Sequence, residues 1–256
     1  MNMILNTRSF GDGPPLVLLH GLFGAAKNLG QLARGLAPDA RVVAMDLRNH
    51  GDSPHAAAMD FATMAGDVAD TIRALNLGPI RLAGHSLGGK TAMALALTQP
   101  DLVSRLAVLD IAPIPYDHDY DNYVAAMRAL KLDHALTRGA ADAALAEVVK
   151  AAPMRAFLLN NLVLGAHPRW RVGLEEIAAA MPSLLDWHDP PGAKPYPGPA
   201  LFLRGAESHY VPPTATPAIA RLFPHAVQDA IPGAAHWLHA DKPQETLAVL
   251  KDFFFP

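Results

Sequence analysis

Short apolar runs alternate with helical segments along this chain of 256 residues, and that alternation restricts the fold more than any other feature. The helical segments lie at 61–77, 87–98 and 244–255, and Gly78-Pro79 ends the first. Strands joined through helices make right-handed crossovers and a parallel sheet covered on both faces. The sequence therefore predicts an α/β fold whose strands are the runs 16–19, 41–45, 80–83, 105–111, 200–203 and 227–231.

The region from about residue 118 to 190 has a different pattern. It contains three or four helical segments and no convincing strand, and Pro153 suits the first turn of a helix continuing to Leu164. A cluster of prolines after 190 marks the return to the sheet. We expect a helical cap at 118–190, inserted into a core formed by 1–117 and 191–256.

Composition excludes several classes of protein. Hydrophobic residues make up 51% and charged residues 18%, which indicates a globular chain rather than a disordered one. A net charge of −3 without a basic run argues against nucleic acid as a partner. No cysteine is present, which excludes thiolate metal sites and a cysteine nucleophile and agrees with a reducing compartment.

Targeting and membrane signals are also missing from the sequence. The start has no secretory pattern, and the longest stretch without Asp, Glu, Lys or Arg, residues 13–26, is too short for a membrane span. We expect a cytoplasmic protein without membrane insertion, either a monomer or a homodimer.

The segment GHSLGGKT at 84–91 satisfies two motifs that compete for the same residues. It matches G-x-S-x-G, the nucleophile elbow that exposes a serine between a strand and a helix, and also the phosphate-binding P-loop. A P-loop normally follows an early strand, whereas this segment follows the third. The elbow reading makes Ser86 the nucleophile and Lys90 a surface residue of the helix.

The rest of the chain supplies the partners that a serine nucleophile needs. His236 follows the last strand, and Asp110 ends the strand after the elbow helix, so both belong at the same sheet edge as Ser86. The order Ser, Asp, His is that of the α/β hydrolases. Early in the chain HGLFG at 20–24 suits an oxyanion loop, which predicts oxyanion donors among the amides of Leu22, Phe23 and Leu87.

These motifs together resemble the α/β-hydrolase superfamily, and within it the YbfF-type bacterial esterases. The resembling segments span most of the chain: HGLFG at 20–24, DLRNHGDS at 46–53, GHSLGGK at 84–90, LDIAP at 109–113 and GAAHWLHADKP at 233–243. The resemblance implies a cofactor-free serine esterase acting on short-chain acyl esters under a helical cap.

One position departs from the broad superfamily pattern. Many members carry the catalytic acid after the next-to-last strand, where this chain has GAESHYVP at 205–212 with Ser208 in the acid's place. We therefore assign the acid to Asp110, with Glu207 as the rival. Ser208 is a candidate fourth member that hydrogen-bonds Asp110 or His236; the alternative is a loop serine that caps the next turn.

Other chemically suggestive residues have simpler explanations. His236 and His239 lack a third metal ligand, and 117–121 lacks the glycine and glutamate of a calcium loop, so we expect no metal. Arg48, Asn49 and His50 suit a turn tied by side-chain hydrogen bonds. Most large apolar residues of the insertion should pack it against the core, with one or two lining an acyl pocket: Met127, Leu130, Phe157, Leu158, Leu162, Trp170 and Trp187.

The sequence thus predicts a serine esterase that hydrolyses short- to medium-chain carboxylic esters through an acyl-enzyme. A thioesterase using the same triad is the main alternative. A carbon–carbon hydrolase, a perhydrolase, a non-catalytic ligand-binding protein and a P-loop NTPase remain as lesser alternatives.

Overall fold

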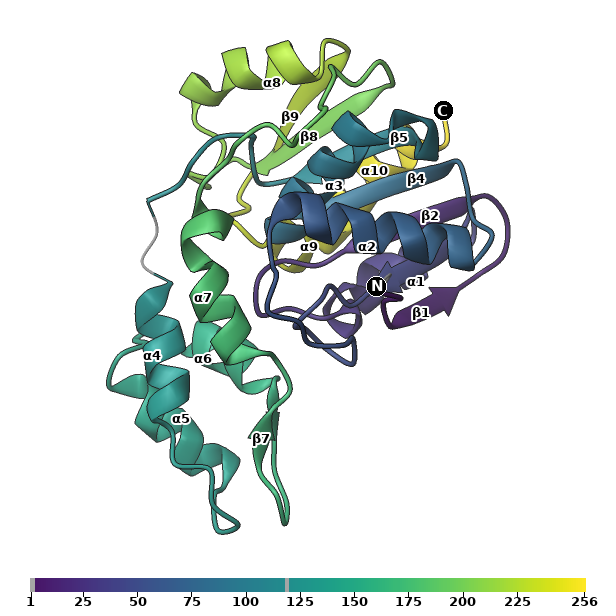
Figure 1. Ribbon diagram of the computed structural model, residues 1–256. Helices are drawn as coiled ribbons and strands as arrows, with labels where there is room; N and C mark the ends of the chain where they lie inside the picture. The colour runs from purple at the N-terminus through teal and green to yellow at the C-terminus, as the bar shows by residue number, and fades with distance from the viewer. Residues whose placement is uncertain (1–2, 118–119) are drawn as a thin grey trace.

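The computed structural model describes residues 3–117 and 120–256, and its centre is a seven-stranded sheet (Figure 1). The strand order is β1-β3-β2-β4-β5-β8-β9, and every neighbouring pair is parallel except β1 with β3. The fold is therefore α/β with a mostly parallel sheet, as predicted. The strands are β1 (Thr7–Phe10), β2 (Pro15–Leu19), β3 (Arg41–Met45), β4 (Ile80–His85), β5 (Val103–Leu109), β8 (Ala200–Gly205) and β9 (Ala226–Ile231).

Helices cover both faces of the sheet because its central strands are apolar on both sides. Val17 and Leu19 of β2 belong to the core beneath α2 (Phe61–Ala74) and α3 (Leu87–Thr98). Leu16 and Leu18 face the opposite core, which is closed by α1 (Gly30–Leu36) and α10 (Pro243–Phe254). Period-two alternation thus places successive residues of one strand in two separate cores.

Four helices and a small hairpin are inserted between β5 and β8, and in Figure 1 they extend away from the sheet. Residues 118–119, at the start of the predicted cap, lie outside the described residues. The inserted elements are α4 (Asp121–Ala129), α5 (Arg138–Ala146), α6 (Ala152–Leu159), β6 (Leu162–Val163), β7 (Arg169–Trp170) and α7 (Leu174–Leu185).

The expectation that this insertion contains no strand is wrong. Leu162 pairs with Trp170 and Val163 with Arg169, in a two-stranded antiparallel ribbon. The helix expected to reach Leu164 therefore ends at Leu159, where the chain turns into β6. Strands of two residues are too short to leave a periodic signal in the sequence.

Several other elements were not predicted. These are the edge strand β1, the helices α1 and α8 (Thr216–Leu222), and the one-turn helix α9 (Leu238–Asp241). All are short and lack a long apolar pattern. Within the described residues, no helix has the length and apolar character that crossing a membrane requires.

Candidate active site

Ser86 lies at the turn between β4 and α3, in a backbone conformation that side-chain-bearing residues rarely adopt. Its φ is 52° and its ψ is −116°. Strand and helix approach closely here: a Cβ on Gly84 would lie 2.2 Å from the Gly88 oxygen, and one on Gly88 would lie 2.5 Å from the Leu19 oxygen. The two glycines of G-x-S-x-G are thus required by sterics, as the elbow predicts.

Asp110 follows β5 directly and is fully buried. Its Oδ2 atom lies 2.7 Å from Nδ1 of His236, and Oδ1 accepts a 2.8 Å hydrogen bond from the Gly205 amide. The Ser208 hydroxyl donates to the same Oδ2 atom that faces His236. The structure therefore brings Asp110, Ser208 and His236 together at the carboxyl edge of the sheet.

Glu207 is not part of this cluster. Glu207 is exposed, and its main-chain amide donates to the main-chain oxygen of Ala234 at 2.9 Å. Within the described residues, the carboxylate that contacts His236 is that of Asp110.

Two residues that contact His236, His85 and Tyr210, were not predicted as part of the site. His85, the second residue of the elbow motif, donates from Nε2 to the His236 oxygen at 2.8 Å. The Tyr210 ring stacks on the His236 imidazole, with centroids 3.6 Å apart and planes 15° apart. The only sequence signal for His85 is its position inside the elbow motif. Tyr210 is one of five tyrosines in the chain, and no motif distinguishes it from the others.

A cavity of about 180 Å³ opens beside Ser86 and His236. Leu22 and Phe23 line it, together with Met154 and Phe157 of α6. A smaller cavity of about 30 Å³ also reaches Ser86 and is lined by apolar residues of α7 and by Leu22, Leu87 and Lys90. Both cavities meet at the side chain that the elbow exposes.

The three predicted oxyanion amides have different surroundings. The Phe23 amide donates to Nε2 of His50 at 3.1 Å, so it is already occupied. Leu22 precedes it in the loop after β2 and lines both cavities. Leu87 is the first residue of α3, where an amide has no acceptor within its own helix.

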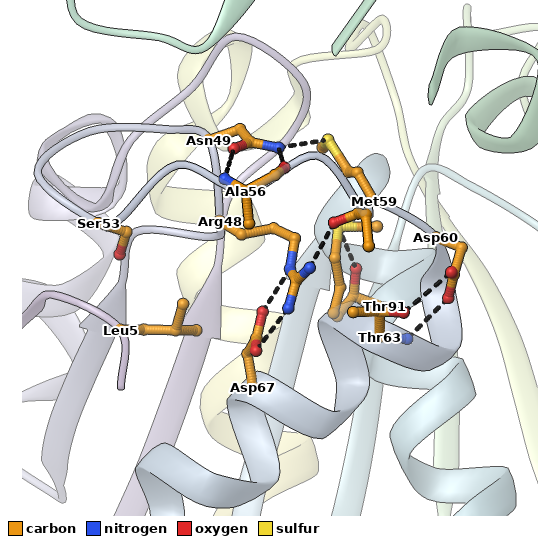
Figure 2. Close-up of polar contacts among 12 residues, drawn as sticks. Leu5, Arg48, Asn49, Ser53, Ala56, Met59, Asp60, Thr63, Asp67 and Thr91 are labelled. Atoms are coloured by element: carbon orange, nitrogen blue, oxygen red, sulfur yellow. Dashed lines mark hydrogen bonds and ion pairs between the residues drawn. The ribbon is translucent and has the colours of Figure 1, made fainter. Parts of the chain in front are cut away.

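The DLRNHGDS segment forms a dense set of hydrogen bonds, as the turn interpretation expects. Arg48 pairs with Asp67, and the Asn49 side chain bonds both polar backbone groups of Ala56 (Figure 2). Asp46 accepts from the Ala26 amide at 2.6 Å. The Asp46 bond ties the loop after β3 to the segment that follows β2, while the Arg48 pair ties it to α2.

Lys90 is not the surface residue that the elbow reading expected. Lys90 is only 2% exposed, and its Nζ atom donates to the main-chain oxygens of Leu185 and Asp186 at 3.4 and 2.8 Å. Burial lowers the pKa of the Lys90 ammonium to about 7. The prediction was wrong because the carboxyl end of α7, whose carbonyl groups contact Lys90, lies far along the chain.

Residues 3–117 and 120–256 contain no group of three or more histidine, aspartate or glutamate side chains placed to hold a metal ion. The suspected 117–121 loop includes residues 118–119, which lie outside the described part of the chain. His239 packs against His85, with ring centroids 4.7 Å apart, and burial lowers the pKa of His239 to about 4.

The large apolar residues of the insertion mostly pack inside it or against the core. Among those named from the sequence, Phe157 lines the larger cavity, and Trp170 is half-buried and donates from its indole to the Met127 oxygen. The buried ones are Met127, Leu130, Leu158, Leu162 and Trp187.

Comparison with known proteins identifies the family of this chain. The family model described as the alpha/beta hydrolase fold matches residues 14–243, and the chain belongs to that family. The sn-1-specific diacylglycerol lipase ABHD11 of Mus musculus is 42% identical, over 94% of this chain and 80% of its own. Esterase YbfF of Escherichia coli is 36% identical, over 94% and 93%.

The solved structures include a similar fold. A structure titled "Marine microorganism esterase" superposes with a TM-score of 0.95 at 34% identity, covering 99% of this chain and all of that one. These relatives are named as lipases and esterases, that is, as carboxylic-ester hydrolases. In the α/β-hydrolase family these residues belong to the nucleophile elbow and its helix, so the match of Lys90 and Thr91 to the P-loop motif is coincidental.

Proposed function

We propose that this protein is a serine esterase that hydrolyses short- to medium-chain carboxylic esters. The observation that carries the proposal is the arrangement at the sheet edge: the strained Ser86 turn opens into the same cavity as His236, whose Nδ1 lies 2.7 Å from a fully buried aspartate. A serine with a histidine base and a buried orienting carboxylate is the machinery of acyl transfer.

In the proposed mechanism, Ser86 attacks the ester carbonyl while Nε2 of His236 takes the hydroxyl proton. The Leu22 and Leu87 amides stabilise the oxyanion of the tetrahedral intermediate, since the Phe23 amide is engaged by His50. His236 then protonates the leaving alcohol. Water, deprotonated by His236, attacks the acyl-enzyme and releases the carboxylic acid.

Asp110 holds the imidazole in one tautomer and stabilises the imidazolium that forms in each step. Three donors surround its carboxylate: the Gly205 amide, the Ser208 hydroxyl and the Nδ1–H of His236. We assign Ser208 a supporting role, because its hydroxyl donates to the oxygen that faces His236 and it lines neither of the cavities beside Ser86.

The segment 118–190 is proposed to act as the cap of this site, since α6 and α7 supply walls of both cavities. The small volumes next to Ser86 favour short acyl groups.

A lipase acting on longer chains is a second candidate, because four relatives 39 to 44% identical are named diacylglycerol lipases. No cofactor is needed for either reaction, and the absence of cysteine agrees with a cytoplasmic setting.

The test is hydrolysis of p-nitrophenyl acetate, butyrate and octanoate by wild type and S86A, with a fluorophosphonate probe on both. We expect turnover and labelling in wild type, loss of both in S86A, and a rate that falls toward octanoate. Matched thioesters separate the esterase from the thioesterase. A rate that rises toward octanoate would favour the lipase, and a folded wild type with neither signal would refute the proposal.

A further inference from the structure

The orientation of the proposed oxyanion donor Leu22 is set by the peptide that joins it to Gly21. The Gly21 oxygen accepts from Nδ1 of His20 at 2.8 Å and from the Gly24 amide at 2.9 Å. Because C=O and N–H point in opposite directions in a trans peptide, holding this oxygen also fixes the direction of the Leu22 N–H. His20 can donate from Nδ1 because its Nε2 accepts from the Leu47 amide at 2.9 Å.

Phe23, the residue after Leu22, has both its main-chain amide and its main-chain oxygen engaged in hydrogen bonds. The Phe23 amide donates to His50, and the Phe23 oxygen accepts from Nδ2 of Asn161 at 2.8 Å. His50 and Asn161 are buried, with 0% and 2% of their surfaces exposed. Phe23 itself has a φ of 59°, a backbone conformation that costs free energy and persists only where surrounding contacts impose it.

Asn161 differs from the other groups that hold this loop because it belongs to the insertion and not to the core. It lies between α6 and β6, and its Nδ2 atom also donates to the Leu158 oxygen at 3.3 Å. Two carbonyl acceptors around one atom identify that atom as the amide nitrogen. The contact therefore joins the end of α6 to the oxyanion loop, 138 residues earlier in the chain.

The same helix forms part of the wall of the larger cavity, through Met154 and Phe157. A substrate in the cavity therefore contacts α6, and α6 is linked through Asn161 to the residue next to Leu22. We propose that Asn161 is a positioning residue of the reaction: it holds the oxyanion loop in its productive conformation and makes that conformation depend on the placement of the cap. This inference rests on the proposed esterase function.

A purely structural role for Asn161, as one of several contacts that hold the insertion on the core, makes a different prediction. The chain offers a matched control for it. Lys27 donates from Nζ to the Asn160 oxygen at 3.0 Å, and this contact joins the adjacent residue of the insertion to the 3-10 turn Ala26–Leu29, which follows the oxyanion loop. It is exposed and involves neither polar group of Phe23. K27M thus removes a neighbouring cap–core contact without touching the oxyanion loop.

The experiment measures kcat and KM for p-nitrophenyl butyrate in wild type, N161L, N161D and K27M. Leucine keeps the approximate volume without donors, and aspartate keeps the shape but sets an oxygen against the Phe23 carbonyl. Losing an oxyanion donor outright costs about 100- to 1,000-fold in kcat. Because N161L and N161D should only misplace the donor, we expect kcat to fall about 10- to 100-fold in these variants. KM should stay within about threefold, since the interaction forms in the transition state. K27M should stay within about twofold of wild type.

A trifluoromethyl ketone, which forms a tetrahedral adduct with the serine, gives a second readout. Its inhibition constant should rise in N161L in proportion to the fall in kcat/KM, because the adduct needs the same donors. A folded N161L with wild-type kcat would overturn the proposal, as would an equal loss in K27M. If neither Asn161 variant folds, the residue serves folding and the proposal is rejected. An inactive wild type, or an S86A variant with full turnover, would instead refute the esterase function.

Discussion

The ammonium group of Lys90 on α3 lies 2.8 Å from the main-chain oxygen of Asp186, the residue that follows α7. It thereby joins the nucleophile helix to the last helix of the insertion. The ring of Tyr116 lies 4.7 Å from Nζ and that of Phe61 5.3 Å from it, which adds cation–π attraction for the charged form. A lysine at the carboxyl end of a helix also complements the helix dipole.

The lowered pKa of Lys90 predicts how stability depends on pH. The pKa is about 7 in the folded protein, because burial disfavours the charge, and about 10.4 in the unfolded chain. Between these values the unfolded chain binds more protons, so the free energy of unfolding should rise with pH, by up to about 1.4 kcal/mol per unit. Urea titrations of wild type and K90M at pH 6.5, 8 and 9.5 test this. Parallel stability curves for the two proteins would contradict it.

Three buried histidines, His20, His50 and His85, and the partly buried His239 predict sensitivity to acid. Burial lowers the pKa of His50 to about 3 and that of His239 to about 4, and it also lowers the pKa values of His20 and His85. In the unfolded chain they titrate near pH 6.5. Their contribution to stability is complete above pH 6.5 and is lost progressively as the pH falls toward 4, because the unfolded chain takes up protons that the folded protein excludes.

The comparison of wild type with H50Q isolates one of these groups. Each histidine adds about 1.4 kcal/mol per pH unit to the slope of the free energy of unfolding, so H50Q should have a shallower slope between pH 6.5 and 4 by about that amount. Carboxylates contribute equally to both proteins and cancel in the difference. Identical slopes would show that His50 is protonated in the folded protein.

The acid of the proposed triad can be identified by three substitutions. D110N should lower kcat by roughly 10⁴-fold, because an amide favours the wrong imidazole tautomer. E207Q should have little effect, since the Glu207 residue is exposed and the contact to His236 comes from Asp110. S208A should have an intermediate effect of about tenfold, comparable to one hydrogen bond to a charged group. A larger loss in E207Q than in D110N would reverse the assignment.

The pair Arg48 and Asp67 should be among the most important polar contacts for stability. Nε and Nη2 of Arg48 lie 2.5 and 2.7 Å from the two carboxylate oxygens, and both side chains are 6% exposed (Figure 2). Removing one partner of a buried pair leaves a charge unpaired, so R48M should destabilise by about 3–5 kcal/mol. The double variant R48M/D67L should lose less than the sum of the single variants. Additive losses in denaturant titrations would contradict this coupling.

Much of the fold was predictable because its signals are local. The central strands are apolar runs of strand length, and α3 was predicted with its observed bounds, Leu87–Thr98. The elbow motif also encodes its own geometry, because only glycine fits at 84 and 88. The edge strand β1 escaped prediction because it is polar, four residues long and paired on one side only.

The sequence by itself determined the fold class, the nucleophile candidate and the chain order of its partners, since each depends on residues close together or on strand order. The tertiary structure alone decided which groups meet: Asp110 rather than Glu207 against His236, the carboxyl end of α7 against Lys90, His50 on the Phe23 amide and Asn161 on the Phe23 oxygen. These contacts join residues 27 to 138 positions apart. No local pattern in the chain encodes such pairs, because they arise only when separate elements pack into one core and bury their polar groups together.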